Sequence, residues 1–305
     1  VDEPSAYALS EGTKLCQISN DGRYYALIFK QDISDAAPKA LKLYDLVKNE
    51  KRMIQINNAA SVITFSDDSK NIFVVDSVEG LNVYDVGDLK LVKNYSEIKD
   101  NVLNIKLSKD SKIVAVNMLS GTAYLYNLET GKRIEEINGE IINVEKAQDE
   151  IIVRGIKKNS IFKWSSTSGL SSWDMDDECL KTPQSFYDVN LYNENTDKLM
   201  IIRNNDVDRK CYLIDFSSGK LKLSLDIALR RYNASGHISP DGKLITIDRD
   251  YFEKSGEKSN DWSYDMVTST YKVLSEEEAS KEVDEILSGR TLSKEEKVEI
   301  GITAK

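Results

Sequence analysis

A short motif recurs along this chain: an apolar, strand-like run that ends in a large apolar residue, aromatic in five of six copies, and a polar one. The copies read LKLYD, LNVYD, AYLYN, IFKWS, CYLID and DWSYD, and they end at Asp45, Asp85, Asn127, Ser165, Asp215 and Asp265. The residues before these ends are separated by 40, 42, 38, 50 and 50 positions. A period of about 40–45 residues is typical of a supersecondary unit of four strands, so the chain is expected to repeat one such unit.

A second motif, Ser-x-Asp followed by a small residue and a strand, precedes most of these copies. Serine and aspartate side chains bond nearby backbone groups, and glycine adopts positive φ at little cost, so the motif predicts a tight turn between two strands. Apolar runs on both sides of the turn support this interpretation. The clear copies are Ser19–Arg23, Ser66–Lys70, Ser108–Lys112 and Ser239–Lys243, and the stretches at 147–150 and 193–197 are degenerate.

Glycine turns follow three of the aromatic copies, at Leu128–Lys132, Ser166–Gly169 and Phe216–Lys220. One unit is therefore expected to be strand, Ser-x-Asp turn, strand, loop, aromatic-ending strand, glycine turn, strand. Such units predict an all-β fold, a β-propeller with six visible four-stranded antiparallel blades. A seventh blade is left open, in the two 50-residue intervals or in Ser5–Gly12. We expect the aromatic residue of each copy in the core and its acidic residue at the start of the following turn.

These motifs resemble the WD-repeat-like propeller family over about residues 12–274. The resemblance rests on the Ser-x-Asp-Gly-Lys turns and on the Tyr-Asp or Trp-Ser pairs ahead of the glycine turns. No copy ends in Trp-Asp, and Gly236-His237 lies directly before a Ser-Pro-Asp turn instead of opening a repeat. The resemblance therefore implies a divergent member that lacks most of the family's buried His-Asp hydrogen bonds.

The pattern changes near the C-terminus. Ser275–Glu278 forms a capping box, and apolar residues then recur at helical spacing up to Gly289. The sequence thus predicts a propeller domain at residues 1–274 and a helical tail packed on it at 275–305. The stretch Gly289–Glu296 resembles the ending of C-terminal propellers in multidomain bacterial signalling proteins, which implies that this chain is part of such a protein.

Composition limits the classes of partner. The net charge is −10 and Lys/Arg clusters are small, so nucleic acid and anionic membranes are poor partners, because binding their phosphates requires cations. No apolar run approaches the roughly 20 residues that a membrane helix needs. The three cysteines, Cys16, Cys179 and Cys211, are widely spaced, which favours reduced thiols and a cytoplasmic location. The oligomeric state is left open.

The sequence offers little for catalysis, and we expect no catalytic residue, metal or cofactor. His237 is the only histidine, which removes Ser-His-Asp triads and His-rich zinc sites. No phosphate-binding glycine loop occurs. The acidic runs Asp174–Glu178 and Asn204–Asp208 lack the spacing of a calcium-binding EF-hand and are expected to be solvated loops. The predicted inner strands offer a channel metal only Glu145 and Asp188.

We therefore expect a non-catalytic module that binds a protein or peptide partner or senses a ligand, because loops on a rigid scaffold carry recognition. The connections from the outer strand of one blade to the inner strand of the next are expected to form one face. The candidate partner-binding residues on that face are Lys99, Asp100, Arg230, Arg231 and Tyr232.

Two alternatives remain. One is an enzyme, a hydrolase or lactonase-like propeller with a metal in its channel, which requires a ring of carboxylates and at least one histidine there. The other is a propeller attached to a secreted peptidase, which the cysteine pattern and the lack of a recognisable export signal disfavour.

Overall fold

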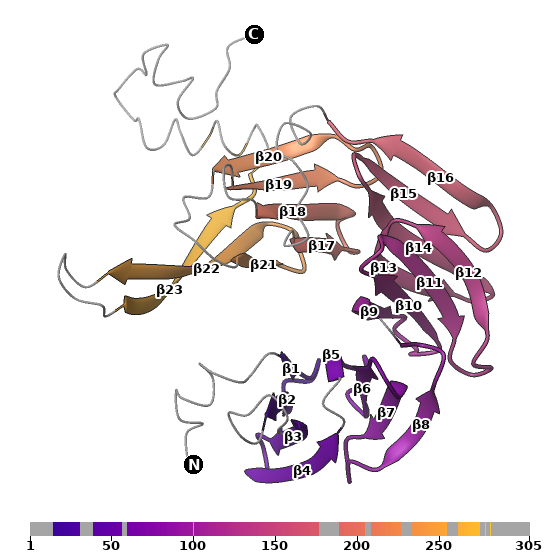
Figure 1. Cartoon of the computed structure of the whole chain (residues 1–305). Coiled ribbons are helices and arrows are strands. Elements are labelled where there is room, and N and C mark those ends of the chain that lie inside the picture. The colour runs from indigo at the N-terminus through magenta and orange to yellow at the C-terminus, as the bar shows by residue number, and fades with distance from the viewer. Residues whose placement is uncertain are drawn as a thin grey trace. The chain divides into compact units, whose positions relative to one another are not determined.

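The computed structural model describes residues 15–30, 39–56, 60–99, 101–176, 189–204, 209–226, 234–254 and 262–274, with residues 278 and 281 in isolation. The chain divides into two compact units, Val1–Leu180 and Lys181–Lys305. All regular structure in the eight described stretches is β-strand, as Figure 1 shows. The expectation of an all-β chain is confirmed for these stretches.

The first unit holds four antiparallel sheets of four strands each, in which neighbours in sequence are neighbours in the sheet. Sheet 1 consists of β1 (Leu15–Ile18), β2 (Tyr24–Lys30), β3 (Lys39–Asp45) and β4 (Glu50–Ile56). Sheet 2 consists of β5 (Ala60–Phe65), β6 (Asn71–Asp76), β7 (Gly80–Asp85) and β8 (Leu91–Tyr95). Sheet 3 consists of β9 (Val102–Leu107), β10 (Ile113–Met118), β11 (Thr122–Asn127) and β12 (Arg133–Asn138). Sheet 4 consists of β13 (Glu140–Ala147), β14 (Glu150–Lys157), β15 (Ser160–Ser165) and β16 (Gly169–Asp174).

The second unit holds two antiparallel sheets. Sheet 5 consists of β17 (Val189–Asn193), β18 (Lys198–Asn204), β19 (Arg209–Asp215) and β20 (Leu221–Asp226). Sheet 6 consists of β21 (Ala234–Ile238), β22 (Leu244–Lys254) and β23 (Trp262–Lys272). The predicted four-stranded unit is thus confirmed five times, whereas the sixth sheet has three strands among the described residues.

The central strands β6 and β10 are buried on both faces, and this explains their nearly continuous apolar sequences. In β6, Ile72 and Val74 belong to a core cluster shared with sheet 1, whereas Phe73 and Val75 belong to one shared with sheet 3. Another cluster joins sheets 3 and 4, and in the second unit one joins sheets 5 and 6. Alternate residues of β6 therefore pack against the two neighbouring sheets, sheet 1 and sheet 3.

The first strand of each sheet contacts the first strand of the next within each unit. In the first unit β1 contacts β5, β5 contacts β9 and β9 contacts β13, and in the second unit β17 contacts β21. A pair of side-chain hydrogen bonds also joins sheets 3 and 4. The Asn117 side chain on β10 accepts from the backbone N–H of Ile141 at 2.8 Å and donates to its carbonyl at 2.7 Å. Asn117 is buried, so its amide serves as an additional backbone-like pair between sheets 3 and 4.

The Ser-x-Asp motif forms the predicted turn with the same bonds each time. In the second copy, the Ser66 hydroxyl donates to Asp68 at 2.7 Å and accepts the N–H of Asn71 at 2.9 Å, while Asp68 accepts the N–H of Lys70 at 3.1 Å. The copies that begin at Ser19, Ser108 and Ser239 repeat these three bonds. The fourth residue of each clear copy has positive φ: Gly22, Ser69, Ser111 and Gly242.

The degenerate copies differ in shape as well as in sequence. Ala147 pairs directly with Glu150, which leaves a two-residue hairpin with positive φ at Gln148. In the other copy positive φ moves to Asp197, the fifth residue of the stretch. The loss of the motif at these two places thus accompanies a different turn.

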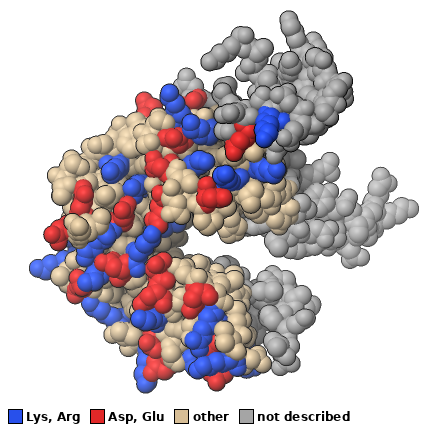
Figure 2. Space-filling model, turned by 180° about the vertical axis from the view of Figure 1, so that it is seen from behind, with Lys and Arg blue, Asp and Glu red and all other residues tan. Residues whose placement is uncertain are grey.

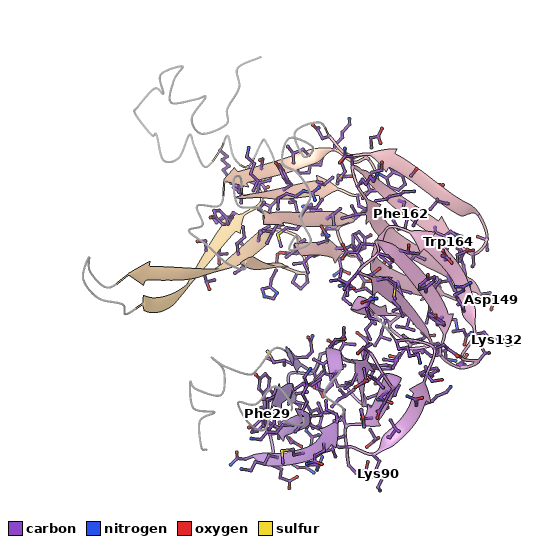
Figure 3. The ribbon with its side chains drawn as sticks, viewed as in Figure 1. Phe29, Lys90, Lys132, Asp149, Phe162 and Trp164 are labelled. Atoms are coloured by element: carbon purple, nitrogen blue, oxygen red, sulfur yellow. The ribbon has the colours of Figure 1, made fainter. Side chains whose placement is uncertain are left out.

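The acidic end of the aromatic motif also has the predicted structural role. Asp45 accepts the N–H groups of Val47 and Lys48 at 3.1 and 3.0 Å, and Asp85 and Asn127 accept equivalent N–H groups. Asp45 is buried and also receives three hydrogen bonds from the Arg23 guanidinium, which holds the pKa of its carboxyl well below the usual range. The aromatic residues Tyr84 and Tyr126 lie in the core as expected, and Trp164, labelled with Phe162 in Figure 3, packs at the edge of its cluster.

The sixth copy of the aromatic motif was assigned wrongly. Sequence places it at Tyr264-Asp265, but both residues lie inside β23, which continues to Lys272. In sheet 2, Ile72 pairs with Tyr84, and the equivalent pair in sheet 6 is Ile245 with Tyr271. The true sixth copy is therefore Thr268–Lys272. The long hairpin formed by β22 and β23 contains a second sequence that resembles the motif, and the prediction chose this sequence.

The helical tail predicted for residues 275–305 lies outside the described stretches except for residues 278 and 281, so the predicted boundary at 274 stays a prediction. Among the described residues, no helix is long and apolar enough to cross a membrane.

Candidate functional site

The predicted partner face is only partly described. Lys99 lies in the connection between β8 and β9, is exposed, and follows the buried Ile98. Two apolar side chains near the same ends of the strands, Leu103 and Leu119, are also exposed, and the Leu119 N–H donates to the carbonyl of Asn101 at 2.8 Å. The other four candidates, Asp100, Arg230, Arg231 and Tyr232, lie outside the described residues. The structure therefore does not test whether the five come together.

A groove is present elsewhere, between sheets 2 and 3, with a volume of about 510 Å³. Its floor is formed by apolar side chains from three strands and one turn, namely Phe73, Val83, Tyr95 and Leu128. Its rim includes Val92 and the Ser-x-Asp turns of both sheets. These turns leave the sheets at the ends opposite to the connections that carry Lys99, because consecutive strands are antiparallel. The Ser-x-Asp turns of the groove rim and the predicted partner face thus lie at opposite ends of the strands, whereas Tyr95 of the floor ends β8 on the side of the Lys99 connection.

Two side chains of β8 are held rigidly at this groove by one carbonyl. The Tyr95 hydroxyl donates to the carbonyl of Leu128 at 2.5 Å, and the Lys93 ammonium donates to the same oxygen at 2.6 Å. Lys93 also lies 4.8 Å from the centroid of the Tyr95 ring and 3.4 Å from the carbonyl of Glu129. Tyr95 is buried, whereas Lys93 is exposed. The outer strand of sheet 2 is thereby tied to the turn of sheet 3, with a cation at the groove wall.

The carboxylates of the rim have lysine partners. Asp68 lies 3.6 Å from Lys70, and Glu129 lies 2.6 Å from Lys112. The Ser66 hydroxyl lowers the pKa of Asp68, and the Lys112 ammonium lowers that of Glu129. These two groups are therefore ionised at neutral pH.

Asp110, the third carboxylate, lies 3.6 Å from Lys146. Burial raises its pKa, but bonds from the Ser108 hydroxyl and the Lys112 N–H lower it further, and the net shift is downward. Charges of both signs therefore surround an apolar floor. Figure 2 shows the same mixing over one face of the molecule, where acidic and basic side chains are interspersed.

The residues considered for a metal or for catalysis take other roles where they are described. Glu145 on the inner strand β13 accepts from Arg154 at 2.9 Å, and Asp174 accepts from Ser160 at 3.0 Å. His237 lies exposed on β21. Residues 177–188 and 205–208, which include Asp188 and parts of both acidic runs, lie outside the described stretches. In the described part of the chain, His, Cys, Asp and Glu form no group of three suited to a metal ion.

The described cysteines are thiols without a disulfide partner. Cys16 is exposed, and Cys211 is buried in the cluster between sheets 5 and 6, where burial raises the pKa of its thiol to about 12. Cys179 lies outside the described residues. A buried thiol with so high a pKa packs as a small apolar side chain and is not a nucleophile at neutral pH.

Sequence reasoning missed the groove because nothing in the spacing of Lys93 and Tyr95 distinguishes them from other residues of an outer strand. Only the structure shows the sign of this contact: β8 is exposed along Leu91–Asn94, yet it ends in the buried Tyr95. A buried aromatic at the end of an exposed edge strand implies a contact with a neighbouring element.

No protein-family model matches this chain, and no curated protein matches it.

Proposed function

We propose that the six sheets are the blades of one β-propeller and that the protein is a non-catalytic module that binds a protein or peptide partner. The observation that carries this proposal is the use of the repeated polar residues. In the clear copies the Ser-x-Asp carboxylate closes a turn, and the polar residues that end the aromatic motifs, such as Asp45, Asp85 and Asn127, do the same. The repeats thus build a frame, and recognition is left to the parts that do not repeat.

The order of the inner strands supports the radial arrangement. Within each unit the first strands of consecutive sheets contact one another, and sheets 1 and 2 extend from that strand to an exposed fourth strand, β4 or β8. A propeller repeats sheets around an axis in this way. A solution measurement tests closure. A compact particle of 305 residues has a radius of gyration of about 19 Å, so small-angle X-ray scattering is expected to give that value, and a clearly larger one would contradict a closed ring.

The resemblance of Gly289–Glu296 to the endings of bacterial signalling proteins supports a cytoplasmic signalling role for the module. Within that role we propose that the partner docks on the face that carries Lys99, Asp100, Arg230, Arg231 and Tyr232. Exposed Leu103 and Leu119 add apolar area near Lys99.

Affinity capture tests this docking face. The full chain and its Arg230→Glu/Arg231→Glu double variant are immobilised and exposed to extract of the source cells, and bound proteins are compared quantitatively. Charge reversal is expected to lower the captured amount of at least one specific partner about tenfold. Charges at the rim of an interface raise the association rate, so their reversal slows binding and lowers capture. A Lys90→Glu variant is the control, since Lys90 is exposed and paired with Asp88 in the turn before β8. Equal capture by wild type and double variant would exclude this face.

A further inference from the structure

We propose that the groove between sheets 2 and 3 binds an extended peptide segment that carries a large apolar side chain next to an aspartate or glutamate. This inference rests on the proposed function, since it names a second binding surface and a partner chemistry for the same interaction module. The surface is formed by Phe73, Val83, Lys93, Tyr95 and Leu128.

The floor of the groove determines the apolar part of the ligand. Phe73, Val83 and Leu128 are buried residues whose surfaces close the bottom of the groove, and its volume of about 510 Å³ accommodates a large side chain with its flanking backbone. The exposed apolar area at the groove belongs to Val92 on its rim, and a ligand side chain stabilises the complex by removing this area from water. An extended segment suits the position beside the outer strand β8, whose Leu91 and Val92 are exposed.

Charge determines the acidic part. The rim carboxylates Asp68, Asp110 and Glu129 each have a lysine within 4 Å. Lys93 differs, because its contacts are two backbone carbonyls and the ring of Tyr95. Carbonyls accept hydrogen bonds but carry no formal charge, so a ligand carboxylate complements the Lys93 ammonium, and Lys109 adds a second cation to the lining. Repulsion by the paired carboxylates is reduced by their own lysines.

Geometry places the two parts of the ligand side by side. The Lys93 ammonium lies 4.8 Å from the centroid of the Tyr95 ring, which belongs to the floor. A carboxylate that reaches Lys93 therefore belongs to the residue that fills the groove or to an adjacent one. The shared bonds of Lys93 and Tyr95 to the Leu128 carbonyl hold both groups in place before binding, which reduces the entropy lost on binding.

Selection from a displayed library of random 12-residue peptides tests the proposal. The full chain is the bait, beside Lys93→Met, Lys93→Glu and, as a matched control, Lys90→Glu. Lys90 lies just before β8, is exposed and is paired with Asp88, and Figure 3 labels it. Wild type and Lys90→Glu are expected to enrich peptides with Asp or Glu beside a large apolar residue. Lys93→Met is expected to bind a selected peptide about tenfold or more weakly, because one charge-assisted hydrogen bond contributes at least that factor.

Lys93→Glu is expected to switch the selected residue from acidic to basic. The proposal is overturned if wild type selects basic peptides, if selected peptides bind all four baits equally, or if no peptide is enriched over an unrelated bait. Circular dichroism spectra of all variants are expected to match wild type, which controls for the fold, and the Lys93 variants are expected to melt slightly lower because they lose the bond to the Leu128 carbonyl. Failure here combined with partner capture that depends on Arg230 and Arg231 would exclude the groove and retain the proposed function. Selected peptides that depend on Lys93, combined with unchanged capture, would retain the groove and exclude the docking face at Arg230 and Arg231.

Discussion

Sheets 2 and 6 are built from the same unit, yet only one of them has the complete pattern. Both have a Ser-x-Asp turn between their first two strands, at Ser66 and Ser239, and both place an isoleucine opposite a tyrosine in the second and third strands. Sheet 2 then turns at Asp85 and adds β8, whereas sheet 6 has no fourth strand among its described residues. Its two last strands instead extend to 11 residues each.

The difference between sheets 2 and 6 shows that strand register identifies a repeat more reliably than its amino-acid sequence does. In sheet 6 the Val273 N–H donates to the carbonyl of Lys243 at 2.7 Å, and in sheet 2 the Val86 N–H donates to Lys70 at 2.9 Å. This bond marks the end of the third strand in both sheets. The Tyr-Asp pair at 264–265 lies seven residues too early and belongs to the hairpin extension.

The largest expected effect concerns the tyrosines of the two sheets. Tyr84→Ala is expected to lower the free energy of unfolding by about 3 kcal/mol, because a large buried aromatic leaves a cavity. Tyr271→Ala is expected to cost about 2 kcal/mol, since Tyr271 is half-buried against its cluster. Tyr264→Ala is expected to cost less, because β22 pairs with β21 only as far as Arg249 and the hairpin extends beyond. Urea denaturation of the three variants measures the order, and a larger loss for Tyr264 than for Tyr271 would reverse the assignment.

The serines of the two turns give a smaller effect. Ser66 is buried, so Ser66→Ala leaves the Asn71 N–H without its hydroxyl partner and is expected to cost about 1–2 kcal/mol. Ser239 is half-buried, and water replaces the lost bond to Leu244, so Ser239→Ala is expected to cost about 0.5 kcal/mol. Thermal melts of both variants compare the losses. Equal losses would show that burial does not distinguish the two turns.

The smallest expected effect is on the pH dependence of the melting temperature. The Ser66 and Ser239 hydroxyls lower the pKa values of Asp68 and Asp241 in the folded protein. A lowered carboxyl pKa stabilises the fold above the unfolded value of about 4 and loses this contribution as pH falls through the folded pKa. Asp68→Asn and Asp241→Asn are therefore each expected to reduce the fall in melting temperature between pH 5 and pH 2. Unchanged slopes in both variants would contradict the assignment of these bonds to the folded state.

Much of the fold followed from the sequence, because its turns use side chains whose chemistry is local. Ser66 and Asp68 specify their turn by bonds to residues within five positions, so the letters alone predict it. The groove depends instead on Lys93 and Tyr95 meeting Leu128 more than thirty residues away. Such contacts depend on how one sheet packs against the next, and no local pattern encodes them.

The candidate partner face was predictable only in part, less than the Ser-x-Asp turns and more than the groove. The sequence places Lys99 in an exposed connection, and the structure agrees. Whether Arg230 and Tyr232 join it depends on the arrangement of whole sheets. Of the two surfaces, the groove was found from packed side chains, whereas the face was predicted from topology.

The turns after the third strands have one further consequence. Four residues after each of the five polar ends, φ is positive, at Asn49, Leu89, Gly131, Gly169 and Gly219. Leucine in this left-handed conformation costs about 1–2 kcal/mol relative to glycine, and burying its side chain returns a similar amount. Leu89 is buried against the core shared by sheets 1 and 2. An exchange between leucine and glycine at position 89 is therefore expected to be nearly neutral, whereas a Cβ at Gly169 would meet no atom within 4 Å and a leucine there would gain no such contact. The backbone conformation of this turn is thus the same in repeats whose amino-acid sequences differ.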